Sequence, residues 1–82
     1  MPIYSDVLVA RFSLETILEK KPDYYNALIL LGIILNEQGD SEKALSFMQK
    51  AYALSKTSKI LNNIEAIKRN PGKKLPYKIV NR

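Results

Sequence analysis

The chain has 82 residues, of which 46% are hydrophobic and 26% charged, so it has the composition of a soluble protein and the length of one small domain. Cysteine and histidine are both absent. Their absence excludes a disulfide framework and a thiolate metal site, and it removes the commonest general base and the commonest metal ligand. A chain without cysteine is compatible with the cytoplasm, which is the compartment we favour.

The charge is unevenly distributed along the chain. Residues 1–55 carry five basic and seven acidic side chains, whereas residues 56–82 carry eight basic side chains against Glu65 alone. The net charge of +5 is therefore the sum of a slightly acidic part and a strongly basic end. Such an end attracts acidic partners, although blocks of lysine are also common in tails that are simply solvated.

No segment indicates secretion or membrane insertion. Residues 1–6 lack the basic start and the apolar core of a secretion signal. The longest apolar run, Ala27–Leu35, is about half as long as a bilayer requires. We therefore expect no transmembrane segment.

Apolar residues repeat at steps of three and four along most of the chain, which predicts four helices. The first covers Pro2–Lys20 and ends before Pro22. We expect Asp23 to cap a second helix, Tyr24–Gln38, which Gly39 ends. A third runs from Asp40 or Ser41 to about Ser55, and a fourth begins at Thr57 or Ser58 and ends at Asn70-Pro71-Gly72. The turns between them are short, so consecutive helices should pack antiparallel and give an all-α fold.

The middle of the chain resembles the tetratricopeptide repeat, a pair of antiparallel helices about 34 residues long. The resemblance is carried by Leu28-x-x-Leu31-Gly32-x-x-Leu35, by Gly39-Asp40, and by Ala44-x-x-x-Met48-x-x-Ala51. Small residues at 32 and 44 would let the two helix backbones approach closely. The resemblance implies one full repeat at 25–58, partial repeats at 2–24 and 59–70, a helical domain over 1–72, and a basic tail at 73–82.

In that family the first helix of each repeat lines a groove that binds extended peptides or helices. Carried over position by position, the resemblance implies a partner-binding groove lined by Asn26, Ile29, Leu30, Ile33, Glu37, Ile60, Asn63, Ile64, Ile67 and Asn70. These positions include neither lysine nor arginine, so a clamp for a terminal carboxylate is not expected. The isoleucines could equally be core residues that the tail or a second copy of the chain covers.

We therefore expect a non-catalytic module that binds another protein or peptide, without a cofactor or a metal. The three glycines stand apart at 32, 39 and 72, so the chain has no glycine-rich phosphate loop. The alternative function is binding of nucleic acid or another polyanion through the basic end, where Lys73, Lys74, Tyr77, Lys78 and Arg82 mix cations with one aromatic ring. We rank nucleic acid well below a protein partner.

The first helix also carries a candidate dimer face. Its apolar side chains would lack a neighbour if no helix packs in front of it, and a homodimer would cover them. The residues of this face are Val7, Leu8, Val9, Phe12 and Leu14.

Overall fold

The computed structural model describes the backbone of residues 3–73 and residue 75, and side chains from residue 8 onward. The described residues form four helices and no strand. The helices are α1 (Ile3–Lys20), α2 (Tyr25–Glu37), α3 (Ser41–Leu54) and α4 (Ser58–Arg69). None of them is long and apolar enough to cross a membrane.

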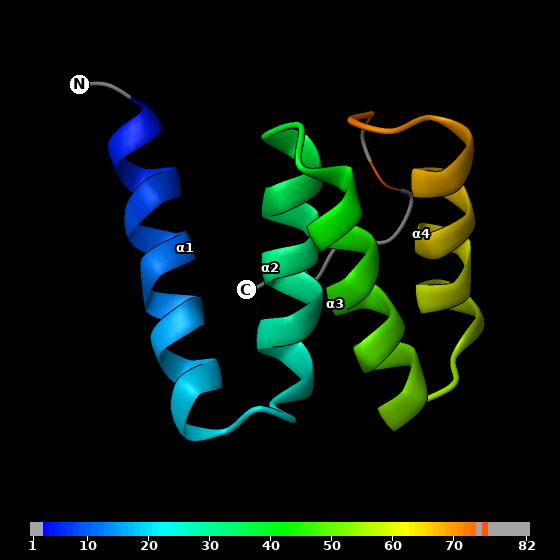
Figure 1. Cartoon of the computed structure of the whole chain (residues 1–82), viewed down its shortest axis with the longest axis horizontal. Coiled ribbons are helices and arrows are strands. Elements are labelled where there is room, and N and C mark those ends of the chain that lie inside the picture. The colour runs from blue at the N-terminus through cyan, green and yellow to red at the C-terminus, as the bar shows by residue number, and fades with distance from the viewer. Residues whose placement is uncertain (1–2, 74, 76–82) are drawn as a thin grey trace.

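The four helices follow one another in an antiparallel row, and α2 packs most extensively against α3 (Figure 1). Each boundary lies within about two residues of the one predicted from the sequence. The all-α fold of antiparallel hairpins is confirmed. One consequence is that α2 and α4 run in the same direction on either side of α3 (Figure 1).

The beginning of α2 differs from the expectation. The backbone N–H of Tyr24 donates to the carbonyl of Lys21 over 3.1 Å, which closes a turn around Pro22 and Asp23. This turn makes Tyr24 the residue at the N-cap, where no side-chain cap hydrogen bond forms. The prediction that Asp23 caps α2 was therefore wrong, because the turn delays the helix by one residue.

The end of α2 follows the predicted chemistry of glycine. Gly39 has φ +94°, and its N–H donates to the carbonyl of Asn36 while the N–H of Asp40 donates to Leu35. These two bonds form a Schellman motif, which satisfies carbonyls at the helix end and reverses the chain. The side chain of Asp40 then accepts from the N–H of Lys43 at 3.3 Å, so α3 begins at a capped end.

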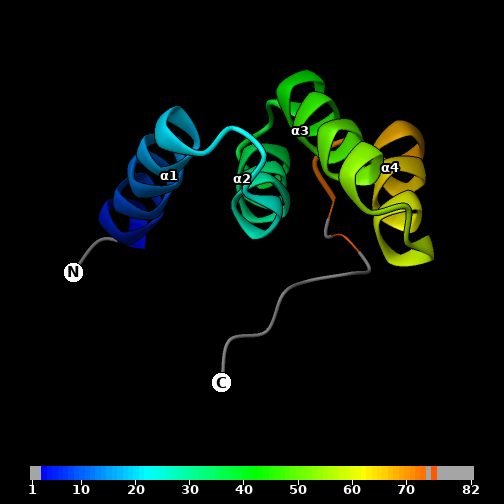
Figure 2. The ribbon, with the colours of Figure 1, turned by 90° about the horizontal axis from the view of Figure 1, so that it is seen from below.

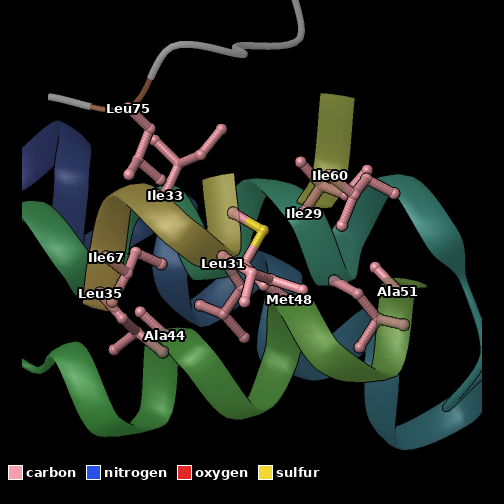
Figure 3. Close-up of a cluster of buried hydrophobic side chains, with 12 residues drawn as sticks. Ile29, Leu31, Ile33, Leu35, Ala44, Met48, Ala51, Ile60, Ile67 and Leu75 are labelled. Carbon is pink, nitrogen blue, oxygen red and sulfur yellow. The ribbon is translucent and has the colours of Figure 1, made fainter. Parts of the chain in front are cut away.

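The hydrophobic core is shared by α2, α3, α4 and Leu75 (Figure 3). Its members are Leu28, Ile29, Leu31, Ile33, Leu35, Ala44, Met48, Ala51, Ile60, Ile64, Ile67 and Leu75. The predicted close approach at Gly32 is confirmed. A Cβ added there would lie 2.9 Å from Cε of Met48 and 3.3 Å from the carbonyl oxygen of Ala44. Only glycine lets α2 and α3 pack at this distance without displacing either neighbour.

Candidate functional site

The candidate site lies on the side of α2 and α4 that faces away from α3, which we call the inner face (Figure 2). The described residues that follow α4 return to this side, between α2 and α4 (Figure 2). The predicted groove residues all belong to α2 and α4, with Asn70 immediately after α4. The inner face therefore combines side chains from two helices with a stretch of non-helical chain.

All five isoleucines of the predicted groove are buried within the chain itself. Ile29 and Ile60 have no exposed surface, and Ile33, the most accessible of the five, is 8% exposed. Ile64 and Ile67 are also core residues. The two helices thus bring these side chains together as the buried floor of the inner face, and not as an open surface.

The accessible part of the inner face comes from the other predicted residues of α2. Asn26 and Glu37 are exposed, and Leu30 is partly buried. Ile34, one turn beyond Leu30, is also partly buried, and within the described part of the chain neither of these two side chains packs against the core cluster. Leu30 and Ile34 consequently form an apolar strip on α2 that the core does not use.

A comparison with protein families identifies the kind of repeat that these helices form. Residues 13–46, which run from the second half of α1 through α2 into α3, match the family model of the tetratricopeptide repeat. The chain contains a tetratricopeptide repeat. The comparisons with curated proteins and with solved structures gave no match. The matched repeat is in a different frame from residues 25–58, so the predicted division into one full and two partial repeats stays a prediction.

Repeats of this family are generally protein–protein interaction modules, and the sequence-based identification of the family is confirmed. Two helices of the matched segment, α1 and α2, are also tied by a polar contact. Arg11 donates to the side-chain oxygen of Gln38 over 2.9 Å and pairs with Glu15 at 3.3 Å. This exposed contact connects α1 to Gln38, the residue that follows α2.

One buried polar side chain of α2, Asn36, was not among the predicted residues, and it lies about 120° around the helix from Leu30, on the side where Gly72 and Lys73 lie. It has no exposed surface, its Nδ2 donates to the carbonyl oxygen of Lys73 over 2.7 Å, and its Oδ1 accepts from the N–H of Gly72 over 3.0 Å. The hydroxyl of Ser41 lies 3.4 Å from the same oxygen. Asn63, which was predicted, is also fully buried. Among the described residues no buried side-chain nitrogen or oxygen lacks a hydrogen-bond partner.

The candidate dimer face divides into two parts. Leu8, Val9 and Phe12 are 57%, 64% and 71% exposed, so they form an apolar patch on α1. Leu14 is partly buried and packs against the core, because it lies about 200° around the helix from Phe12. The side chain of Val7 lies outside the described residues.

The basic end of the chain is described only in part. Lys68, Arg69 and Lys73 are exposed near the end of α4. Lys74, Tyr77, Lys78 and Arg82 lie outside the described residues, so the predicted polyanion site has no described geometry. In the described part of the chain, no three His, Cys, Asp or Glu side chains gather as they would around a metal ion.

Proposed function

We propose that this chain is a non-catalytic protein–protein interaction module whose inner face receives a partner polypeptide. The family of the matched repeat supports a protein partner. The observation that carries the choice of face is the apolar strip of Leu30 and Ile34 on α2, beside the exposed polar side chains of Asn26 and Glu37. An apolar centre with a polar rim is the usual composition of a protein interface.

The non-catalytic part of the proposal is supported by the composition of the chain. Without histidine or cysteine, a catalytic site would have to use carboxylates, lysine, tyrosine or hydroxyl groups. The acidic residues of residues 8–73 are spread over exposed or half-exposed positions. Such solvated carboxylates, standing apart from one another on the described helices, are the usual composition of a helix surface.

A partner-capture experiment with matched variants tests the proposal. The full chain and its Leu30→Lys and Leu54→Lys variants are immobilised, and bound proteins are compared by mass spectrometry. Leu54 is 51% exposed on α3 and serves as the control for an added charge on another helix. We expect Leu30→Lys to lose a partner that the other two chains retain. The Kd of the purified partner should accordingly rise for Leu30→Lys and stay unchanged for Leu54→Lys.

Equal capture by all three chains would overturn the inner face as the binding surface. The alternative, binding of a polyanion through the basic end, would instead appear as strong dependence on salt. Neutralised phosphates release counterions, so the logarithm of the binding constant falls steeply with the logarithm of salt concentration, whereas apolar contacts show little dependence. The exposed side chains of Lys68, Arg69 and Lys73 are the described residues that favour this alternative.

We also propose that α1 mediates self-association through Leu8, Val9 and Phe12. Three apolar side chains more than half exposed on consecutive turns are uncommon on a helix that faces only water. A second copy of the chain can cover them by two-fold pairing, because the same surface then serves both partners. This contact lies on α1 and leaves the inner face of α2 and α4 free for another protein.

A further inference from the structure

The chain turns back on itself immediately after α4. The N–H of Lys73 donates to the carbonyl of Asn70 over 3.2 Å, and Gly72, the third residue of this turn, has φ +85°. Proline followed by a glycine at positive φ is the pattern of a type II turn. We call Gly72, Lys73 and Leu75, the described residues from this turn onward, the return segment.

Asn36 binds the main chain of the return segment through both ends of its side-chain amide. Its side-chain amide accepts from the N–H of Gly72 and donates to the carbonyl of Lys73. An asparagine amide has the same donor and acceptor as a peptide group, so the contact resembles the pairing of two neighbouring strands. Any polypeptide that presents the N–H of one residue and the carbonyl of the following residue in this geometry could make the same two bonds.

The return segment also makes a side-chain contact, through Leu75, two residues after the Lys73 carbonyl that Asn36 binds. Leu75 is 4% exposed and belongs to the same apolar cluster as Ile33 of α2 and Ile67 of α4. Figure 3 shows the side chains of Leu75 and Ile33 directed toward each other. The return segment is therefore held in two ways. Asn36 binds its main chain, and Leu75 packs in the apolar cluster of Ile33 and Ile67.

We propose that the partner of the inner face is an extended polypeptide segment with a leucine two residues beyond the carbonyl that Asn36 binds, and that the return segment is its built-in competitor. This inference rests on the proposed function and specifies its ligand. The return segment shows the chemistry that fits, and a partner segment must displace it. Because the competitor is attached through a few residues, its effective concentration is on the order of millimolar, so only partners that bind more tightly than the return segment succeed.

A peptide with the sequence of residues 70–82 tests this inference in trans. It is titrated into the isotopically labelled full chain and into its Leu75→Asp variant, and binding is followed by nuclear magnetic resonance of the Asn36 side-chain amide. We expect saturable shifts in the variant and an affinity for the wild-type chain that is at least about tenfold weaker, because the wild-type site is already occupied. The same peptide with Leu75→Asp should produce no shift.

The Leu75→Ala variant serves as a second host if Leu75→Asp does not fold, since it removes apolar contact without adding a charge. Absence of saturable shifts in a folded host, or shifts confined to residues away from Asn36, would overturn the inference and make the return segment a fixed part of the core. The Leu30→Lys capture experiment leaves Asn36 and Leu75 unchanged. A partner lost in that experiment together with no peptide binding would overturn this inference alone.

Discussion

The side chain of Asn36 holds the backbone of Lys73, with Nδ2 of the asparagine 2.7 Å from the lysine carbonyl oxygen. The two residues are 37 positions apart in the chain. Asn36 lies near the end of α2 and Lys73 follows the turn after α4, so this bond connects the first helix of the inner face to the return segment. It is the shortest of the three hydrogen bonds described for this side chain.

Replacement of Asn36 by alanine should destabilise the chain. The change removes both bonds to the return segment and leaves the N–H of Gly72 and the carbonyl of Lys73 without their partner. We expect a loss of about 1–3 kcal/mol in the free energy of unfolding, reduced by the better helix propensity of alanine. Urea unfolding followed by circular dichroism measures it. Asn26→Ala, at an exposed position of the same helix, is the control and should stay within about 0.5 kcal/mol of the wild-type chain.

The contact at Gly32 gives a graded prediction. Gly32→Leu places a large side chain where even a Cβ would lie 2.9 Å from Cε of Met48, so we expect it to cost roughly 1–3 kcal/mol or more through overpacking. Gly32→Ala should cost less, because the end of the Met48 side chain can move and because alanine stabilises a helix by about 1 kcal/mol relative to glycine. Thermal unfolding compares the two variants. Unchanged melting of Gly32→Leu would contradict the close packing of α2 on α3.

The helices were predictable because their signals are local. Gly39 and the Pro71-Gly72 pair mark chain reversals by their own backbone preferences, and the small residues at 32 and 44 indicated where α2 and α3 approach. The prediction that Asp23 caps α2 was wrong because of an equally local feature of the backbone. The turn that closes between Lys21 and Tyr24 shifts the helix start by one residue, and the spacing of apolar residues cannot resolve such a shift.

The candidate site was predictable only in outline. Helical positions correctly assigned Ile33 and Ile67 to α2 and α4. Coverage of these isoleucines by the tail was one of the alternatives, but the helical pattern could not choose it or identify Leu75 as the residue that packs on them. The role of Asn36 depends on two backbone groups 36 and 37 residues further along the chain, and no periodicity within α2 reveals them. Contacts between an ordered helix and a distant non-helical segment are set by tertiary structure, which residue patterns along a helix do not encode.

The burial of the inner-face isoleucines leads to a prediction about α4. Ile67 is 2% exposed, and its truncation to alanine should cost about 2–5 kcal/mol through lost burial and the cavity left behind. Leu61 on the same helix is 37% exposed, so Leu61→Ala is the matched control and should cost far less. Chemical unfolding of both variants measures the difference. Equal and small losses would show that Ile67 faces an open groove, as the sequence alone allowed.

The exposed patch on α1 gives the last prediction. Phe12 is 71% exposed between Leu8 and the polar contacts of Arg11 and Glu15, so a second copy could bury the ring without breaking a described bond. Sedimentation equilibrium at several concentrations should show the mass of the wild-type chain rising from 9.3 kDa toward twice that value. Phe12→Lys should hold the mass at that of the monomer, because pairing would bury a charge without a partner.

Two further variants locate the contact in the same experiment. Leu54→Lys adds the same charge on α3 and should leave self-association unchanged, since Leu54 lies on a different helix from the patch. Leu75→Asp should also leave it unchanged in a folded chain, because Leu75 packs on α2 and α4 and not on the patch of α1. If Leu75→Asp abolishes self-association and Phe12→Lys does not, copies of the chain exchange their return segments and the patch on α1 is not the interface. A wild-type chain that stays monomeric at every concentration would contradict the prediction outright.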